Sequence, residues 1–350
     1  MRVNGPFDLP DFRLWLLDQW RPGGEFSRND EFNTRWPFTW DGTVHCPSPS
    51  GKVQRRSLAE AALWWVSEEM SALIDHASRT VPATTLTDDL LPSDNGLVVF
   101  GSPLAGHASD TGEQLDVYAM GWTRCSIHER RRQAKGRRLS ANVLDGLNIV
   151  PYRYVPKGTP APVGIVPIDG PVKPDRVATI AGKPVGVVYG PEPEGHWTPA
   201  GVTHWVMDTD SDFAEDGETE MQVASLSEDR RWLAALWLLA SQPLAESRVQ
   251  RAARSVARRS SRANMVSDVR LVDLRRRASS PGEHEPAGGS HRSPSYRFVV
   301  GEESGGFWRQ QAYGPGWSLH KPKWIFPFVK GPKDKPLKLR ETVNVVRGDQ

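Results

Sequence analysis

Two short runs of alternating residues decide the fold class. Residues 115–122 read L-D-V-Y-A-M-G-W, and residues 148–155 read N-I-V-P-Y-R-Y-V. A period of two is typical of strands that bury one face. Because Pro151 cannot donate to a strand ladder, we expect the second run to be an edge strand or to carry a bulge.

Further strand-like runs lie around these two. Residues 97–100, 164–168 and 185–189 are short apolar runs bounded by turn residues, and aromatic residues alternate within 31–46. Runs at this spacing favour an antiparallel sheet over alternating strand–helix units. We therefore expect an α+β protein with mostly antiparallel strands, a few helices and a small β-rich C-terminal unit.

Helical periodicity is present in three apolar segments. In 8–20 the apolar residues follow the i, i+3, i+4 spacing of a helix face. A capping-box pattern formed by Ser57 and Glu60 predicts the start of one long helix over 58–78. The segment 228–241 is apolar nearly all round, which predicts a buried helix.

The segment 244–262 predicts a fourth helix, which is basic. At 100° per residue its arginines fall within an arc of roughly 140°, and small apolar residues occupy the other side. Guanidinium groups on one arc suit bidentate contacts with phosphates. A solvated basic face, or one that pairs with acidic parts of the chain, is the alternative. The arginines are Arg248, Arg251, Arg254, Arg258, Arg259 and Arg262.

The last part of the chain interleaves aromatic and basic residues. We expect a strand at 268–275, a linker at 276–294 and strands at about 295–301, 322–329 and 341–347. Exposed aromatic rings there could stack on bases while cations follow the phosphate backbone; burial of the same rings in a core is the alternative. The rings are Trp308, Tyr313, Trp317, Trp324 and Phe328, and the cations include Arg309, Lys321, Lys323 and Lys330.

Candidate catalytic residues are few. His291, Arg309 and His320 could serve a metal-independent ribonuclease, which needs an acid–base pair and cations near the scissile phosphate. His45-Cys46 and Cys125-x-x-His128 contain ligand types for zinc, but adjacent ligands are geometrically awkward and no C-x-x-C pair supports them, so we expect neither a metal nor a cofactor. Walker A, Rossmann, G-x-S-x-G and H-E-x-x-H motifs are absent from the sequence.

Composition indicates a globular protein with an uneven charge. The 350 residues are 38% hydrophobic and 25% charged, and 14 of them are Trp, which favours a core with many aromatic anchors. Two cysteines and no apolar run of membrane-spanning length predict a cytoplasmic protein that does not bind membranes. Residues 243–350 hold 21 Lys/Arg against 10 Asp/Glu, whereas the rest holds 23 against 32. This split favours a polyanion-facing C-terminal part.

Four parts of the chain follow from these patterns. We expect an acidic, Trp-rich α+β region at 1–226, and then a helical pair leading into a strand at 227–275. A flexible linker at 276–294 and a basic, β-rich C-terminal unit at 295–350 complete the chain.

The C-terminal part resembles uncharacterised proteins of actinobacteria and actinophages. The resemblance implies a phage or mobile-element setting and no particular activity. Where that family has Gly-His-Trp-Arg, this chain has G-F-W-R at 306–309. The pieces that carry the resemblance are 271–276 (L-V-D-L-R-R), 291–292 (H-R), 296–300 (Y-R-F-V-V), 307–316 (F-W-R-Q-Q-A-Y-G-P-G), 323–332 (K-W-I-F-P-F-V-K-G-P) and 334–337 (D-K-P-L).

Three functions are consistent with these features. The first is a non-enzymatic nucleic-acid-binding accessory protein of a phage or mobile element, which grips DNA or RNA through the arginines and the aromatic, basic platform. The second is a metal-independent ribonuclease or toxin-like enzyme. The third is a module for protein interaction or self-assembly, in which aromatic content and charge asymmetry serve a partner.

Overall fold

The structure is a computed structural model of the whole chain. It describes residues 3–26, 51–105 apart from 83 and 85, 116–131, 140–155, 157–158, 160–166, 176–180, 183–191, 195–199, 203–207, 220–275, 298–300, 305–330, 332 and 336. The segments 31–46, 276–294 and 341–347, for which the sequence predicts strands or a linker, lie outside these residues.

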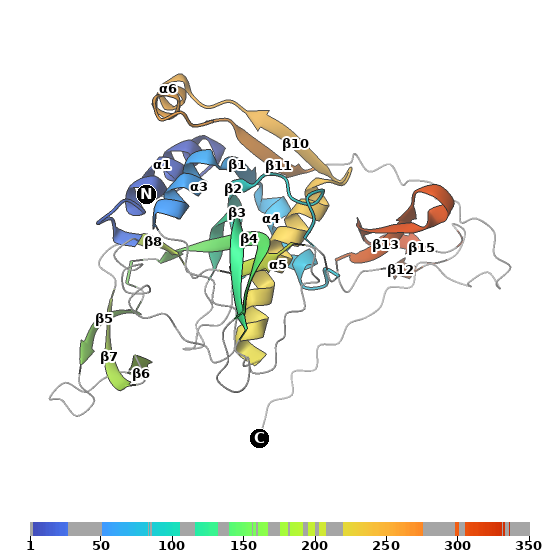
Figure 1. Cartoon of the computed structure of the whole chain (residues 1–350). Coiled ribbons are helices and arrows are strands. Elements are labelled where there is room, and N and C mark those ends of the chain that lie inside the picture. Colours follow the sequence, from blue (N-terminus) through green and yellow to red (C-terminus); the bar gives the residue numbers. More distant parts are fainter. Residues whose placement is uncertain are drawn as a thin grey trace.

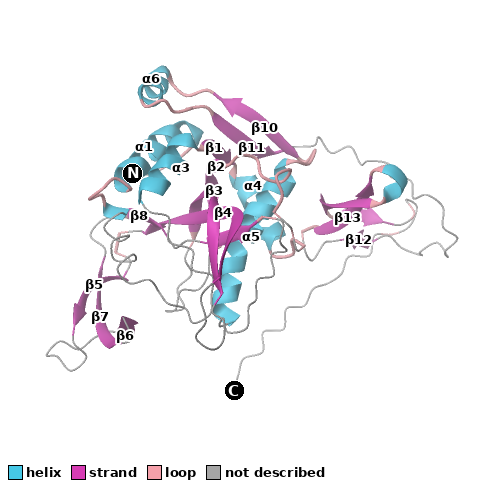
Figure 2. Cartoon of the chain, in the orientation of Figure 1, coloured by secondary structure: helices cyan, strands magenta, loops and turns pink. Residues whose placement is uncertain are grey.

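A mixed sheet forms the centre of the molecule (Figures 1 and 2). Its strand order is β10-β11-β1-β2-β3-β4-β8, and β9 also pairs with β4. In this sheet β1 runs parallel to β11 and β2, and the other pairs are antiparallel. The strands are β1 (Ala62–Val66), β2 (Asn95–Leu104), β3 (Val117–Arg131), β4 (Ser140–Val155), β8 (His196–Pro199), β9 (Thr203–Val206), β10 (Ala245–Gln250) and β11 (Val269–Leu274).

Helices cover both faces of this sheet (Figure 1). On one face lie α1 (Leu9–Gln19), which follows the 3-10 turn Pro6–Asp8, and α3 (Gly51–Glu60). On the other lie α4 (Glu68–Ser78) and α5 (Glu220–Ala240). Leu97 and Val99 of β2 therefore face one core cluster while Val98 and Phe100 face the other, which explains the continuous apolar run.

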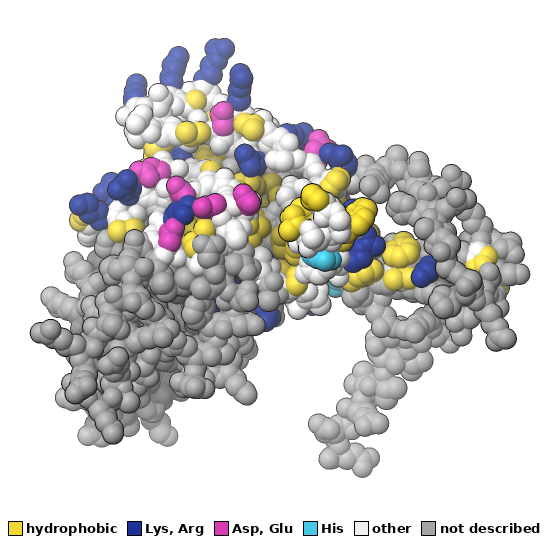
Figure 3. Space-filling model, turned by 45° about the vertical axis from the view of Figure 1, so that its right-hand side comes forward, with side chains coloured by type: hydrophobic (Ala, Val, Ile, Leu, Met, Phe, Trp, Pro, Cys, Tyr) yellow, Lys and Arg dark blue, Asp and Glu magenta, His cyan; other side chains and the backbone are white. Residues whose placement is uncertain are grey.

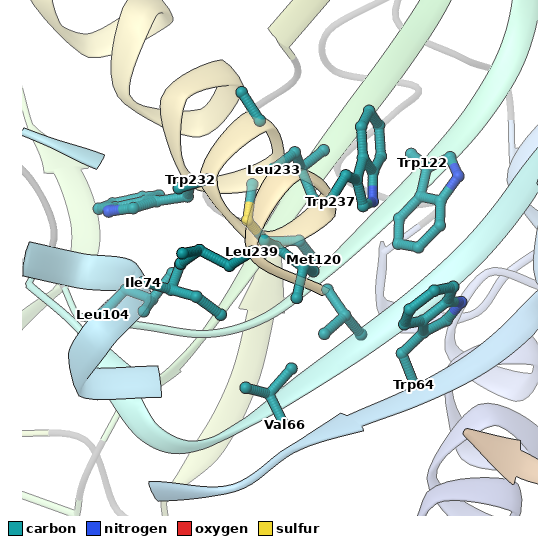
Figure 4. Packing of buried hydrophobic residues seen from close by; sticks show 14 of the residues in the cluster. Trp64, Val66, Ile74, Leu104, Met120, Trp122, Trp232, Leu233, Trp237 and Leu239 are labelled. Atoms are coloured by element: carbon teal, nitrogen blue, oxygen red, sulfur yellow. The ribbon is translucent and has the colours of Figure 1, made fainter. Parts of the chain in front are cut away.

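Tryptophans dominate the core between the sheet and α5 (Figure 4). The ring of Trp237 from α5 lies edge-on to Trp122 of β3, with centroids 5.5 Å apart, and stacks on Trp205 of β9 at 5.9 Å. The indole N–H of Trp122 donates to the Ser93 carbonyl at 2.9 Å, so this buried polar group is satisfied. The abundance of Trp thus reflects, in large part, the aromatic core that composition predicts.

The predicted helix over 58–78 is wrong, because a strand divides it. The first helix, α3, ends at Glu60, then β1 pairs with two parallel neighbours, and α4 begins at Glu68. Ser67 caps α4 by accepting from the Met70 amide at 3.4 Å, whereas Ser57 lies within α3. The β1–α4–β2 unit is a parallel crossover, so strand–helix units are present alongside the antiparallel strands.

Pro151 lies inside the sheet, and the prediction of an edge strand or a bulge is wrong. It pairs in regular register with Met120 of β3. On its other side, β4 pairs with β9 through residues 146–149 and with β8 through residues 152–155. Pro151 falls in the gap between these two partners, where its missing N–H removes no ladder hydrogen bond.

The α+β class is confirmed, and several of the other predicted helices and strands are present in the structure. Helix α1 matches the segment 8–20, and α5 covers the segment 228–241 except its last residue and begins two turns earlier. Strands occupy each of the predicted runs from 97 to 189 and at 268–275. Among them β5 (Pro160–Val166), β7 (Lys183–Pro191) and β6 (Arg176–Ile180) form a separate sheet in the order β5-β7-β6.

The C-terminal part contains two small antiparallel sheets. Strands β13 (Phe307–Tyr313) and β14 (Leu319–Ile325) form a hairpin around the 3-10 turn η2 (Pro315–Trp317), and β12 (Phe298–Val300) pairs with β15 (Phe328–Lys330). The single strand predicted over 322–329 is wrong, because residues 326–327 separate β14 from β15. The predicted boundary between 226 and 227 falls within α5, and β11 pairs with β1 across it.

Candidate nucleic-acid interface

The predicted helix over 244–262 is shorter than its arginine pattern implies. Residues 245–250 form β10, which pairs along its length with β11, and only Arg254–Arg262 form a helix, α6. Strand pairing overrides the helical pattern here because β10 completes the sheet. Arg248 therefore lies on a strand and Arg251 in the irregular segment that follows it, so the six arginines do not share one helical arc.

Helix α6 nevertheless presents a row of arginines. Arg254, Arg258 and Arg262 are spaced by four residues, so they lie on one side of the helix, about 6 Å apart along its axis. All three are exposed, while Val256 and Ser260 on the opposite side are buried. Figure 3 shows the basic side chains projecting from this end of the molecule.

Acidic partners account for only part of the predicted arginine set. Arg259 binds Asp11 of α1 at 2.6 Å, and Arg248 lies 3.5 Å from Asp273. Within the described part of the chain, no ion pair involves Arg254, Arg258 or Arg262. Among the described residues, the alternative in which acidic parts of the chain neutralise the basic face therefore applies to two arginines and leaves the row on α6 without an ion-pair partner.

The row on α6 is unfavourable for the helix itself. Like charges at i, i+4 destabilise a helix by about 0.2–0.5 kcal/mol per pair, and the N-cap residue Ala253 offers no side-chain acceptor. Burial of Val256 and the Arg259–Asp11 pair hold α6 against this repulsion. An anion bound along the row would remove the repulsion and add attraction.

The β13–β14 hairpin has one basic face and one aromatic face. Register pairs Arg309 with Lys323, Gln311 with Lys321 and Tyr313 with Leu319, so these six side chains share a face. Trp308 and Trp324 are paired on the opposite face, which is turned toward the main core. Four predicted binding residues, Arg309, Tyr313, Lys321 and Lys323, are thus brought together.

The predicted stacking set divides into buried and exposed rings. Trp324 is buried, and the half-buried Trp308 donates its indole N–H to the Ala77 carbonyl of α4 at 2.8 Å. These two rings hold the hairpin on the core and do not reach a base. Tyr313, Trp317 and Phe328 are 40%, 68% and 44% exposed, so they remain candidates for stacking.

The exposed rings and cations are ordered by local contacts. The Lys321 ammonium lies over the Tyr313 ring at 5.2 Å, and the Arg309 guanidinium donates to the Gln311 side-chain carbonyl. Trp317 has a φ of 59°, which is uncommon for a bulky residue, and it follows Gly316 at 63°. Sequence reasoning did not single out Gln311, although its i, i+2 spacing from Arg309 on a strand places both on one face.

The two basic surfaces are separate. Figure 1 shows α6 at the upper left and β13 on the right, with β10 and β11 between them. Lys330, the remaining cation of the predicted platform, is exposed on β15. A single short ligand therefore cannot contact the α6 row and the hairpin at the same time.

Of the catalytic candidates, Arg309 and His320 are among the described residues, and they do not share a face of the hairpin. His291 lies outside the described residues, and His320 pairs with Ala312, on the face opposite Arg309 and Lys323. Burial raises the pKa of Cys125 to about 11, so this thiol is largely protonated at neutral pH. No cluster of metal-ligating side chains occurs among the described residues, and the Asp94 carboxylate lies 3.5 Å from the Arg124 guanidinium.

Comparisons with known proteins add nothing to this site: no family model, curated protein or solved structure matches the chain. In the part of the chain described by the structure, no helix is long and apolar enough to cross a bilayer.

Proposed function

We propose that this protein is a non-enzymatic nucleic-acid-binding protein that grips phosphates through the arginine row of α6. The observation that carries the proposal is the uncompensated row itself. Arg254, Arg258 and Arg262 are exposed on one helix side, and of the four arginines of α6 only Arg259 has a carboxylate partner within the part of the chain that the structure describes. Three aligned guanidinium groups suit successive phosphates, because each can donate two parallel hydrogen bonds.

A second contact surface supports the same function. The exposed face of the β13–β14 hairpin combines Arg309, Lys321 and Lys323 with the ring of Tyr313, and Trp317 is exposed at its tip. Cations beside exposed rings are what single-stranded nucleic acid needs, since bases stack on rings while phosphates meet the cations. We assign backbone binding to α6 and stacking on unpaired bases to the hairpin.

The cellular setting is part of the proposal. A phage or mobile-element origin is supported by the resemblance of the C-terminal part, and a cytoplasmic location by the low cysteine content. Both fit a protein whose ligand is DNA or RNA.

The test is fluorescence anisotropy of labelled single- and double-stranded DNA and RNA, titrated with the full chain over a range of salt concentrations. The decisive variant changes Arg254, Arg258 and Arg262 together to Gln. Because each lost phosphate contact lowers the log–log salt slope by about 0.7–0.9, we expect the slope to fall by roughly two and the affinity at low salt by at least tenfold.

The matched control removes the same charge elsewhere. All three control residues are exposed: Arg79 directly follows α4, Lys157 lies in the turn after β4 and Arg231 lies on α5. Changing these three to Gln should leave the salt slope within about 0.5 of the parent value, since none belongs to the row. Equal losses in both triple variants would mean that only net charge attracts the ligand, and the α6 assignment would fail.

The hairpin is tested separately with Tyr313→Ala and Trp317→Ala. Each should weaken binding to single strands by about 1–3 kcal/mol and leave duplex binding nearly unchanged, because duplex bases are not available for stacking. If neither change affects single-strand affinity, the hairpin has no stacking role. The α6 proposal is tested independently by the triple arginine variant.

A further inference from the structure

Beyond nucleic-acid binding, the outer edge of the central sheet has the features of a self-association surface. Strand β10 ends the strand order, and Glu246, Ser247, Arg248 and Val249 are all exposed. Val249 is 64% exposed, and among the described residues no strand pairs with this edge (Figure 1). A sheet edge presents unpaired N–H and C=O groups that readily pair with another strand.

Hydrogen bonding to β11 fixes which backbone groups of β10 face outward. The Arg275 amide donates to the Leu244 carbonyl at 2.8 Å, which identifies these opposite residues as a hydrogen-bonded pair. Pairs of this kind recur at every second residue of an antiparallel ladder. Glu246 and Arg248 therefore bond to β11, whereas the N–H and C=O groups of Ser247 and Val249 point away from the sheet.

We propose that two copies of this chain associate through antiparallel pairing of their β10 strands about a twofold axis at Ser247. In this register Ser247 faces its own counterpart, and Val249 faces Ala245 of the second copy. The outward groups of Ser247 form a hydrogen-bonded pair with themselves across the axis. The Val249 amide donates to the second copy's Ala245 carbonyl. The reciprocal bond does not form, because the Ala245 amide already donates to the Gln242 carbonyl of its own chain at 3.0 Å.

Charge selects this register over its neighbours. With the axis at Ser247, each Glu246 lies opposite Arg248 of the other copy, in a non-hydrogen-bonded pair where side chains approach closely. Moving the axis by one residue places Arg248 opposite Arg248 or Glu246 opposite Glu246. Both alternatives oppose like charges, so the sequence of β10 is self-complementary only in the first arrangement.

In a single copy of the chain, the charges along the outer edge of β10 are not balanced. Glu246 lies directly opposite Asp273 of β11, and like charges in that position destabilise a sheet. Arg248 lies 3.5 Å from Asp273, whereas Glu246 has no ion pair among the described residues. A second copy supplies another arginine on the outer side of each Glu246, which balances the charges along the edge.

The experiment is a charge swap measured by sedimentation velocity, with the full chain free of nucleic acid, so that it does not depend on the proposed function. The parent protein should show a dimer whose fraction increases with concentration. Arg248→Glu and Glu246→Arg should each shift the dimer dissociation constant by at least tenfold toward monomer. A one-to-one mixture of the two variants should restore the dimer, because both cross-strand pairs are again of opposite charge.

Restoration in the mixture excludes misfolding as the cause of dissociation in either variant. A Ser247→Pro variant, which removes the outward amide at the axis, provides a second measurement and should remain monomeric alone and in mixtures. The proposal is overturned if the parent chain stays monomeric over the whole concentration range. It is also overturned if the parent forms a dimer that neither charge variant weakens.

Discussion

Trp324 attaches the C-terminal hairpin to the main core, and its removal should release the hairpin. The side chain is 2% exposed and lies edge-on to Trp308, with centroids 5.3 Å apart, and to His76 of α4 at 5.9 Å. The backbone amide of Trp324 donates to the Gln242 side chain at 3.0 Å, just after the end of α5. We predict that Trp324→Ala undocks β13 and β14 from α4 and α5.

The magnitude follows from two opposing contributions. Burial of about 200 Å² of an indole at roughly 25 cal/mol per Å² stabilises docking by about 5 kcal/mol. The Trp324 indole N–H is buried without an acceptor among the described residues, which costs about 1–3 kcal/mol. The net loss in Trp324→Ala should therefore be about 2–4 kcal/mol.

Native-state hydrogen exchange followed by mass spectrometry measures this loss where it acts. Amides of β13 and β14 should exchange faster in Trp324→Ala by a factor that corresponds to the same 2–4 kcal/mol, about 30- to 1000-fold, while those of β2 and β3 change little. Trp324→Phe is the matched control, because it keeps most of the apolar contact and removes the unsatisfied N–H. Unchanged exchange in the Ala variant would refute the view that this side chain anchors the hairpin.

Three further predictions concern the core. Arg13 is fully buried, and two of its guanidinium nitrogens have no hydrogen-bond partner among the described residues. Burial lowers the pKa of Arg13 to about 10, which shows that the charged form is disfavoured there. Arg13→Met should therefore raise the free energy of unfolding, measured by urea denaturation, by about 1–3 kcal/mol. A lower stability would show that this guanidinium is a favourable part of the core. Ser67→Ala removes the cap of α4 and should cost about 1 kcal/mol in the same measurement, with Ser67→Asp restoring it. Because burial raises the pKa of Cys125 to about 11, its alkylation in a Cys46→Ser background should speed up toward pH 11, and a half-maximal rate near pH 9 would contradict that burial.

Local sequence patterns determined a large part of the architecture. The alternation in residues 115–122 predicts β3, and the i, i+3, i+4 spacing in residues 8–20 predicts α1. Both signals are local, because one buried face repeats every two residues in a strand and about every 3.6 in a helix. The sequence also shows the arginines of α6 and the basic residues of the hairpin, but it does not show which of them share one exposed surface.

Where a segment meets a distant partner, local pattern was insufficient. Ala62–Val66 continues a helical pattern in the sequence, but it forms β1 because β2 and β11 offer hydrogen bonds on both sides. In the same way β10 pairs with β11, and this pairing takes Arg248 out of the predicted helical arc. Secondary-structure preference is weak compared with the burial and pairing that a completed sheet provides.

The α+β class, the regular elements with clear periodicity and the residue types available for binding phosphate follow from the amino-acid sequence. Which tryptophans are anchors and which are exposed follows from the folded arrangement alone, since Trp324 and Trp317 have similar surroundings in the sequence but opposite burial. The folded arrangement also decides which arginines are neutralised, because Arg259 meets Asp11 from 248 residues away. Burial and charge pairing depend on contacts between distant segments, and such contacts exist only in the folded chain.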